Sequence, residues 1–452
     1  MLKDFRYDSH TNTFIFNSNQ RLYLIIISIL VVAFVLVFYV LPPYGSNVAT
    51  DPIIKITYAD YMSDSHLRVI ALFNKQHEGQ IEVVPINLPF SKFSTNDRKE
   101  LLARYFRSKS DRIDVFSVDQ IWVPRFTKWC LPLANYIPAR QVEALSKYAM
   151  HTCYFNNELV AAPLYLDIAV MFYRKDLIDA LPNAEYWESQ LDHSITWQNL
   201  FRLRKEMHNG NRPFFVFQAA PYEGLSCIYT ELIANMNEQM ALQDSMDLGT
   251  PAAENALQFL VDMVQKQDVS PRSVLDFNED QSYEYFLKNN GVFLRAWPGF
   301  ARERALQKKF PESFFDCVPA PLPHLEGSKP AYIFGGWNLM ISRFSTKIPE
   351  AAEFVRFLLS KESQEMMYRY DGILPINDSV YADSSFVKEY PELRFYQSLL
   401  KGGVYRPFSS GYTRASDILS YYLNLAIRGK ISAKKALQRA AKDIGSIGDS
   451  KD

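Results

Sequence analysis

Aromatic rings and carboxylates occur where the local sequence would display them on one side of an extended segment. Tyr165 and Asp167 alternate with Leu164 and Leu166, so a strand would place the ring and the carboxylate on the same face. Trp297 precedes a proline, which favours an extended backbone and a ring displayed at a strand end. A carboxylate accepts strong charge-assisted hydrogen bonds, and a ring packs on an apolar face. The chemistry that these residues favour is therefore non-covalent binding.

A second candidate group is the run of Gly335, Gly336 and Trp337 inside an apolar, β-prone segment. Two adjacent glycines weaken a strand, so they mark a bulge or a place where another group approaches the backbone closely. Trp337 would then offer a flat apolar face to that group. It could equally fill the core beside a buried bulge, and these residues alone leave both interpretations open.

Charged residues lie at the ends of several expected elements. Asp119 follows a strand over 113–118, and carboxylates at the carboxyl ends of strands in an open α/β sheet point into the ligand crevice. Asp64 lies just before a helical pattern, where it could cap the helix. Arg98 falls in the first turn of another helix, where a cation is unfavourable, so a role outside that helix is favoured.

Several classes of chemistry lack their motifs. There is no Walker phosphate loop, no His-Glu-x-x-His, no Gly-x-Ser-x-Gly and no Rossmann glycine fingerprint, and the seven histidines are scattered. A net charge of -1 gives no reason to expect nucleic acid as a partner. We therefore expect no catalytic residue, metal or cofactor. The four cysteines lack CxxC spacing, so one disulfide or four thiols both remain open: Cys130, Cys153, Cys227 and Cys317.

The elements that would position these residues follow from hydrophobic periodicity. Strands are expected over 53–59, 81–87 and 113–118. Helices are expected from Asp64, from Thr95 or Asn96, over 251–264 and from Pro349. The 452 residues exceed one ordinary domain, and a hydrophobic content of 48% is enough for two cores.

The N-terminal region predicts a membrane anchor. Residues 22–41 carry no charge, and a helix of that length at ~1.5 Å per residue spans a bilayer. Basic residues in the polar segment 1–21 precede it and none follows before Lys55, so the N-terminus should stay in the cytoplasm. A cleavable signal peptide is the alternative, but its apolar region is usually shorter, about 7 to 15 residues. Residues 42–52 would tether the exported body to the cytoplasmic membrane.

Three consecutive segments carry a resemblance to a known family. They are GGWNLMIS from Gly335, PEAAEFVRFLLSKESQEMM from Pro349 and GILPINDSVY from Gly372. In this order they resemble the C-terminal signature of the extracellular solute-binding proteins of ABC sugar importers, the family of maltose- and trehalose-binding proteins. A Tyr-Glu-Gly-Leu element at Tyr222 is similar to the trehalose/maltose subset, and the resemblance covers about residues 53–444.

The resemblance implies an α/β periplasmic-binding-protein fold, with two lobes joined by a hinge and a ligand cleft between them. Lobe 1 would comprise residues 53–162 and 319–365, and lobe 2 residues 163–318 and 366–452. Cys130 and Cys153 would share lobe 1, which makes them the favoured disulfide pair.

The resemblance also implies ligand contacts. Asp60 and Asp64 are candidates near the start of the first helix, with Asp64 preferred. The eleven expected ligand-binding residues are Asp64, Arg98, Asp119, Tyr165, Asp167, Tyr222, Glu223, Trp297, Gly336, Trp337 and Arg406. For Arg406 a surface position is the alternative.

The implied function is that of the extracytoplasmic substrate-binding component of an ABC transporter. It would close on a carbohydrate, of the trehalose or maltose type, and deliver it to membrane permease subunits served by a separate ATPase subunit. Two alternatives are a membrane-anchored sugar-sensing input domain for a signalling partner and a glycoside-cleaving enzyme. The family resemblance argues against the enzyme.

Overall fold

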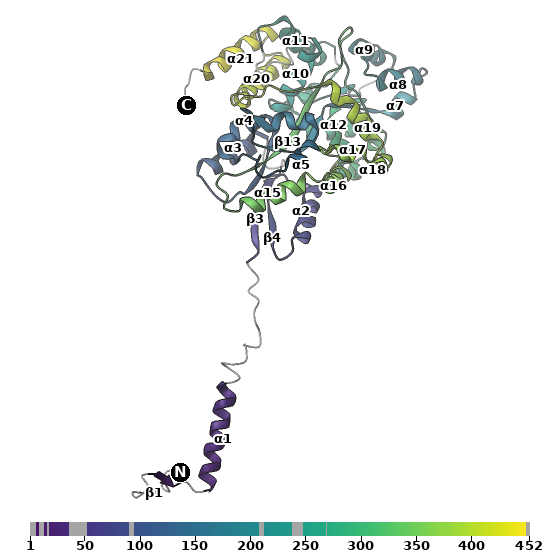
Figure 1. Cartoon of the computed structure of the whole chain (residues 1–452). Coiled ribbons are helices and arrows are strands. Elements are labelled where there is room, and N and C mark those ends of the chain that lie inside the picture. Colours follow the sequence, from purple (N-terminus) through teal and green to yellow (C-terminus); the bar gives the residue numbers. More distant parts are fainter. Residues whose placement is uncertain are drawn as a thin grey trace. The chain divides into compact units, whose positions relative to one another are not determined.

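The computed structural model of the chain describes residues 6–8, 13–15, 18–35, 52–89, 95–207, 212–236, 247–267 and 269–448 (Figure 1). The chain divides into two units, residues 1–53 and 54–452. In the first unit, β1 (Arg6–Asp8) pairs antiparallel with β2 (Thr13–Ile15), and α1 covers Ser18–Val35.

The expected membrane-spanning helix over 22–41 falls partly on α1. Within the described residues, no helix is both long enough and apolar enough to cross a membrane. Residues 36–41 of the expected span lie outside the described residues, as does nearly all of the tether over 42–52.

Among its described residues, the second unit contains two large sheets and one small two-stranded sheet, formed by β6 (Tyr154–Phe155) and β7 (Glu158–Leu159). The larger sheet has the strand order β14-β13-β5-β3-β4, and β8 also pairs with β13. Its three parallel strands are β3 (Ile54–Asp60), β4 (Ile81–Asn87) and β5 (Val115–Asp119). The long strand β13 (Tyr332–Ile341) runs antiparallel to β5 and to β8 (Ala162–Ile168), and β14 (Gly403–Val404) pairs with its start.

The smaller sheet has the order β10-β11-β9-β12. Its strands are β9 (Val170–Arg174), β10 (Phe215–Val216), β11 (Phe293–Ala296) and β12 (Cys317–Ala320). Because β8 belongs to one sheet and β9 to the other, the chain passes between the sheets at Ala169. It returns between β12 and β13. The lobe boundaries given above stay a prediction.

Helices cover both sheets. On the larger sheet, α16 (Lys361–Asp371) packs on α2 (Asp64–Gln76), and α15 (Ile348–Leu358) packs on β3 and β13. The helix α3 (Thr95–Arg107) lies between β4 and β5 in the chain. Figure 1 shows α20 (Tyr412–Ile427) and α21 (Ala433–Gly448) beside α10 (Glu223–Met236) and α11 (Pro251–Gln265), and these helices pack on one another.

The expected element starts agree closely with the structure. The strand over 81–87 and the helix starts at Asp64 and Thr95 are confirmed by β4, α2 and α3. Capping of α2 by Asp64 is wrong, because the hydroxyl of Ser63 accepts the bond from the backbone N–H of His66. The helix expected from Pro349 starts at Ile348 and is followed by a second helix, α16.

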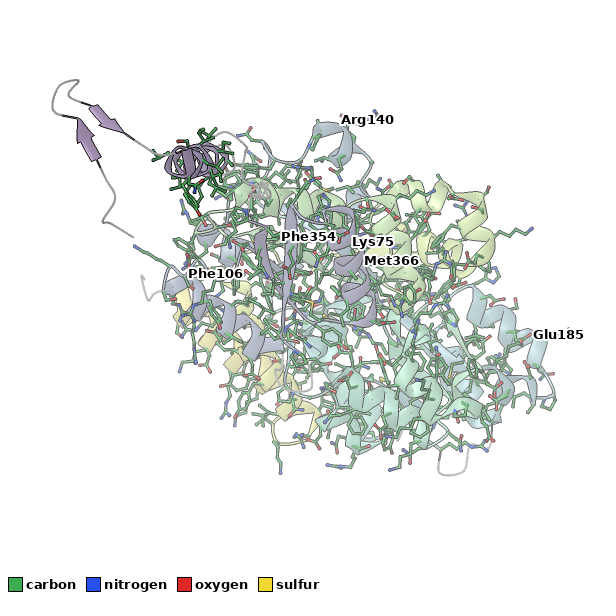
Figure 2. The ribbon with its side chains drawn as sticks, turned by 90° about the horizontal axis from the view of Figure 1, so that it is seen from below. Lys75, Phe106, Arg140, Glu185, Phe354 and Met366 are labelled. Carbon is green, nitrogen blue, oxygen red and sulfur yellow. The ribbon has the colours of Figure 1, made fainter. Side chains whose placement is uncertain are left out.

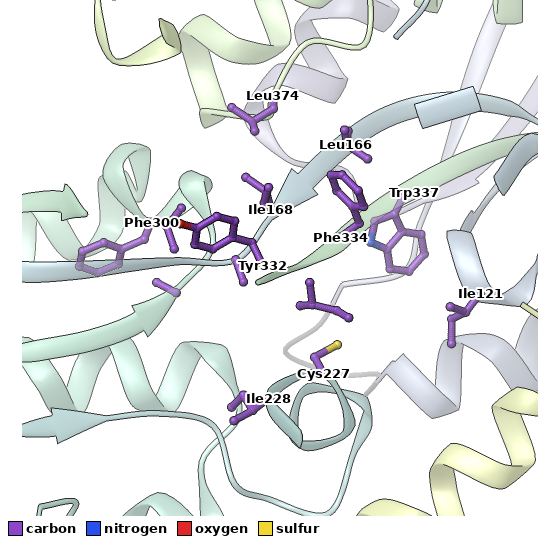
Figure 3. Close-up of a cluster of buried hydrophobic side chains, with 14 of the residues drawn as sticks. Ile121, Leu166, Ile168, Cys227, Ile228, Phe300, Tyr332, Phe334, Trp337 and Leu374 are labelled. Carbon is purple, nitrogen blue, oxygen red and sulfur yellow. The ribbon is translucent and has the colours of Figure 1, made fainter. Parts of the chain in front are cut away.

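The core lies along β13. All ten residues of this strand are buried. Figure 3 shows Phe334 and Trp337 on β13 near Leu166 and Ile168 of β8, and in Figure 2 the buried Phe354 of α15 lies inside the molecule while Arg140 and Glu185 lie at its edge. All four cysteines are free thiols, so the favoured disulfide between Cys130 and Cys153 is absent from this structure.

Candidate ligand-binding site

A cavity of about 630 Å³ opens beside β13 and is lined by segments of both sheets. Its volume lies within the range of about 300 to 1,000 Å³ that is usual for small-molecule sites. The larger sheet contributes the ends of β5 and β8, the middle of β13 and the start of α2. The chain between strands of the smaller sheet contributes the first turn of α10 and the first turn of α12 (Glu279–Lys288), and the segment that follows β11 also lines the cavity.

Ten of the eleven expected ligand-binding residues line this cavity. They are Asp64, Asp119, Tyr165, Asp167, Tyr222, Glu223, Trp297, Gly336, Trp337 and Arg406. Arg98 does not line it: its side chain is fully buried, and its guanidinium lies over the ring of Trp337. Asp60 is likewise buried away from the cavity and accepts a hydrogen bond of 2.7 Å from Arg98.

The two glycines of β13, Gly335 and Gly336, leave room for other groups to pack closely against this strand in the cavity wall. Gly336 has φ of +132°, and a Cβ there would lie 2.5 Å from the backbone oxygen of Tyr165. A Cβ on Gly335 would lie 2.9 Å from the ring of Trp297. The pairing with β8 also shifts register between Trp337 and Asn338. The strand therefore has a bulge, and the backbone of Tyr165 and the ring of Trp297 also approach its two glycines closely.

Arg406 connects two carboxylates of the cavity. Its Nη2 donates to Oδ1 of Asp119 at 2.8 Å, and its Nη1 donates to Oε1 of Glu223 at 3.0 Å. Ser416 and Tyr412 of α20 also donate to Glu223. Burial raises the pKa of Glu223, and the nearby charge of Asp119 adds to this, while Arg406 opposes it. Arg406 is therefore a buried residue of the cavity wall rather than a surface arginine.

The carboxylate of Asp167 lies in the cavity wall without a charged partner in contact with it. No other described residue forms a hydrogen bond or an ion pair with it. Burial raises its pKa to about 7, with a smaller opposing effect from the charge of Arg295 and a further rise from Asp119. Such a group can donate or accept a hydrogen bond near neutral pH, which suits a hydroxyl partner.

The sequence reasoning missed one acidic part of the cavity. Asp280 and Glu303 line it together with Asp371 and the ring of Tyr61. Burial raises the pKa of Glu303, and the charges of Asp280 and Asp371 add to the rise. Asp280 lies in the first turn of α12, after the capping residue Asn278, and Asp371 is the last residue of α16. Each local sequence pattern therefore indicates a helix end and gives no sign of a ligand-binding site.

Other missed residues lie at the start of α2. Ser63 and His66 line the cavity, and the Ser63 hydroxyl donates to Asp371. Across the cavity, Arg304 donates to Oδ2 of Asp64 at 2.9 Å. Among the described residues, no group of three or more His, Cys, Asp or Glu side chains is arranged to hold a metal ion.

The cavity lies between segments of the two large sheets and is lined by aromatic rings, carboxylates and arginines, as expected of a protein that binds a small polar solute. A profile of the bacterial extracellular solute-binding protein family matches residues 59–365. The chain therefore belongs to this family, which confirms the resemblance stated from the sequence. Membership also confirms the expectation of an extracytoplasmic binding protein and not an enzyme.

Individual relatives agree with the family. A probable ABC transporter-binding protein of Deinococcus radiodurans is 26% identical over 367 residues, which are 77% of this chain and 83% of that protein. The maltose-bound structure of T. maritima MalE3 aligns with a TM-score of 0.77 at 26% identity and covers 87% of this chain and 100% of that one. This confirms the α/β periplasmic-binding-protein fold.

A more distant structure shows the fold alone. The cyclic α-maltosyl-1,6-maltose binding protein of Arthrobacter globiformis aligns with a TM-score of 0.68 at 19% identity, over 87% of this chain and 99% of that one.

Proposed function

We propose that this chain is the substrate-binding component of an ABC importer for a carbohydrate, and that its ligand is a disaccharide of the trehalose or maltose type. The observation that carries the proposal is the composition of the 630 Å³ cavity, where two indole rings meet several carboxylates. Sugars present hydroxyl groups and apolar C–H faces. Carboxylates and arginine bind the former through charge-assisted hydrogen bonds, and rings pack on the latter.

The residues divide by these two tasks. Asp64, Asp119, Asp167, Glu223 and Arg406 would bind hydroxyl groups. Tyr165, Tyr222, Trp297 and Trp337 would provide ring faces, and the backbone at Gly336 leaves space for a ring to approach. The maltose bound to T. maritima MalE3 supports this class of ligand.

Thermal unfolding of residues 52–452 with millimolar trehalose, maltose, sucrose or glucose tests the proposal. A ligand at ~100 times its dissociation constant adds about 2.7 kcal/mol to the free energy of unfolding, so the midpoint should rise by several degrees with one disaccharide. Trp337→Ala should remove the rise. Tyr421→Ala should keep it, because Tyr421 is 52% exposed on α20 and does not line the cavity. No rise with any of these sugars would overturn the sugar proposal.

Delivery to a permease is the second part of the proposal. Ligand contacts made by both lobes would stabilise the closed state over the open one, and the permease would bind the closed state. Cells that lack this chain should lose uptake of the labelled sugar identified above and regain it with the wild-type chain. Normal uptake, with loss of a sugar-induced transcriptional response instead, would favour the sensing alternative.

A membrane anchor over residues 22–41 is part of the proposal and is supported only by the sequence of that segment. It predicts that the full chain sediments with membranes and is released by detergent but not by carbonate. A chain without residues 1–45 should stay in the supernatant. Release of the full chain by carbonate would contradict the anchor.

A further inference from the structure

Both tryptophans of the cavity have a buried arginine against one ring face. The guanidinium carbon of Arg98 lies 4.3 Å from the ring centroid of Trp337, and that of Arg295 lies 4.3 Å from the ring centroid of Trp297. Trp337 and Trp297 line the cavity, whereas neither arginine does. Both arginine side chains are at most 2% exposed. Each ring therefore has an arginine on its buried side.

Each arginine is in turn held by a buried carboxylate. Nη2 of Arg98 donates to Asp60 at 2.7 Å, and Nη2 of Arg295 donates to Glu231 at 2.5 Å. The first stack is built from α3, the end of β3 and β13, which belong to the larger sheet. The second is built from β11 of the smaller sheet, the residue that follows it, and α10. The same order of carboxylate, guanidinium and indole therefore occurs twice, from unrelated stretches of chain.

In both stacks, burial and the charge of the partner act in opposite directions on the pKa values. Burial opposes ionisation of Asp60, but the hydrogen bond and charge of His66 and the charge of Arg98 outweigh it and hold the pKa of Asp60 well below its usual range. Burial also opposes the charge of Arg295, and Glu231 more than compensates, which raises the pKa of Arg295. Buried ion pairs often give little net stability relative to apolar residues, so stability alone does not account for two of them beside the cavity.

We propose that Arg98 and Arg295 are positioning residues that hold the indoles of Trp337 and Trp297 in place for the ligand without touching it. A planar guanidinium matches an indole face, and the carboxylate behind it fixes the plane of the guanidinium. Each ring also has a further contact: Trp337 meets Trp122 edge to face at 5.3 Å, and Trp297 packs against the backbone of Gly335 (Figure 3 shows Trp337 on β13).

The stacks also bear on specificity. A cation on the buried face draws the electron density of the ring toward it, which weakens the attraction of the open face for a second cation. The open faces are then better suited to the neutral C–H face of a sugar than to an ammonium group. This part deepens the proposed function and rests on it, whereas the positioning role does not.

Fluorine NMR of the full chain, labelled with 5-fluorotryptophan, tests the positioning role without any ligand. The six tryptophans give six resonances, and Trp337→Phe and Trp297→Phe assign the two of interest. Arg98→Lys keeps a charge beside Asp60 but removes the planar group, so it should move or broaden the Trp337 resonance, with a smaller effect on Trp122. Arg295→Lys should do the same to Trp297.

Arg174→Lys is the matched control. Arg174 is buried and donates two hydrogen bonds to Asp176, at 2.7 and 2.6 Å, and among the described residues no tryptophan lies under its guanidinium. It should move neither resonance. Unchanged Trp337 and Trp297 resonances in the two test variants, or equal movement of all six, would overturn the proposal. The thermal midpoints of all three variants show whether each one is folded.

Affinity provides the second measurement. Titration with maltose and trehalose should show dissociation constants raised about tenfold in Arg98→Lys and in Arg295→Lys, as expected for loss of a buried cation–π contact, and unchanged in Arg174→Lys. A shifted resonance together with no sugar binding by the wild-type chain would leave the positioning role intact and overturn the proposed function. Wild-type affinity in both test variants would overturn the link between the stacks and the ligand.

Discussion

At the scale of single residues, Asp167 shows how the cavity sets the properties of a side chain. Its neighbours in β8 and β13 are apolar or aromatic, and Gly335 lies opposite it in the strand pairing. Burial in this place disfavours the charged form, and Asp119 adds a like charge. The carboxyl group is therefore held near its midpoint of titration at neutral pH, where a ligand hydroxyl can meet either form.

Asp167→Asn should reduce the pH dependence of stability. The pKa of Asp167 rises from 3.8 to about 7 on folding, so the favourable contribution is present below pH 3.8 and is lost as pH rises through 7. Between pH 5 and pH 8 the wild-type free energy of unfolding should fall by about 1 to 3 kcal/mol more than that of the variant. Urea unfolding at both pH values measures this.

The exposed Asp276, 71% accessible, provides the control for that experiment. Asp276→Asn should leave the difference between pH 5 and pH 8 unchanged. An equal pH dependence in wild type and Asp167→Asn would show that burial does not raise the pKa of Asp167.

The sequence predicted residues that lie in recognisable local patterns and missed those that only the tertiary structure brings together. Tyr165 and Asp167 alternate on a strand, and their common side was readable from that spacing. Arg98 was expected to contact the ligand, but it lies behind Trp337, away from the cavity, because the tertiary structure brings α3 and β13 together at this point. Asp280 and Asp371 lie at ends of separate helices, and no local pattern relates them.

At the scale of elements, β13 depends on Gly336. The positive φ of this residue is a conformation that side chains rarely adopt, and the added Cβ would meet the Tyr165 oxygen. Gly336→Ala should lower the free energy of unfolding by about 3 kcal/mol through strain and overpacking. Gly411→Ala, with φ of −84° and nothing near the added Cβ, should change it little. Equal urea midpoints for the two variants would show that the strand relaxes.

The helix α16 is attached to β8, to the end of α15 and to the loop after α16 through Gln364. Its amide nitrogen donates to the carbonyl oxygens of Leu164 and Leu358, each at 3.0 Å, and its oxygen accepts from the N–H of Ile376 at 2.9 Å. Gln364→Leu would leave these buried backbone groups without a partner. Such a loss lowers the free energy of unfolding by about 1 to 3 kcal/mol. Urea unfolding should show a drop of that size or more.

Gln397→Leu is the control for Gln364→Leu. Gln397 accepts one bond from the exposed Arg394, so its loss should change the free energy of unfolding by less than about 0.5 kcal/mol. A small effect at both positions would mean that water or a shifted backbone satisfies the groups around Gln364.

At the scale of the whole molecule, the family resemblance predicted the α/β periplasmic-binding-protein fold, because its motifs lie on strands and helices that the fold needs. Local periodicity gave the element starts, such as α2 at Asp64. It did not give the point where the chain leaves one sheet for the other, since β8 and β9 are separated only by Ala169 and read as one apolar strand. The division depends on tertiary strand pairing, because β8 pairs with β13 whereas β9 pairs with β11 and β12.

Arg406 joins the two parts of the molecule. It binds Asp119, at the end of β5 in the larger sheet, and Glu223, in the chain between β10 and β11 of the smaller sheet. Arg406→Met would leave two buried carboxylates without their cation, and breaking a buried pair in this way costs about 3 to 5 kcal/mol. The loss should be larger at pH 8 than at pH 5. Without the arginine the pKa of Glu223 rises further, because the charge of Arg406 no longer opposes burial, so protonation of Glu223 relieves the variant at low pH.

Urea unfolding of wild type and Arg406→Met at the two pH values measures this prediction, with Arg369→Met as the control. Arg369 pairs with Glu389 at an exposed position, and such pairs contribute about 0 to 1 kcal/mol. Arg406→Lys keeps a charge but loses the simultaneous hydrogen bonds to Asp119 and Glu223. Its free energy of unfolding should therefore lie between those of wild type and Arg406→Met, and it should depend less on pH than that of Arg406→Met. A loss in Arg406→Met that is the same at pH 5 and pH 8 would mean that the carboxylates reach water when the arginine is gone, and that Arg406 joins the two sheets by packing and not by charge.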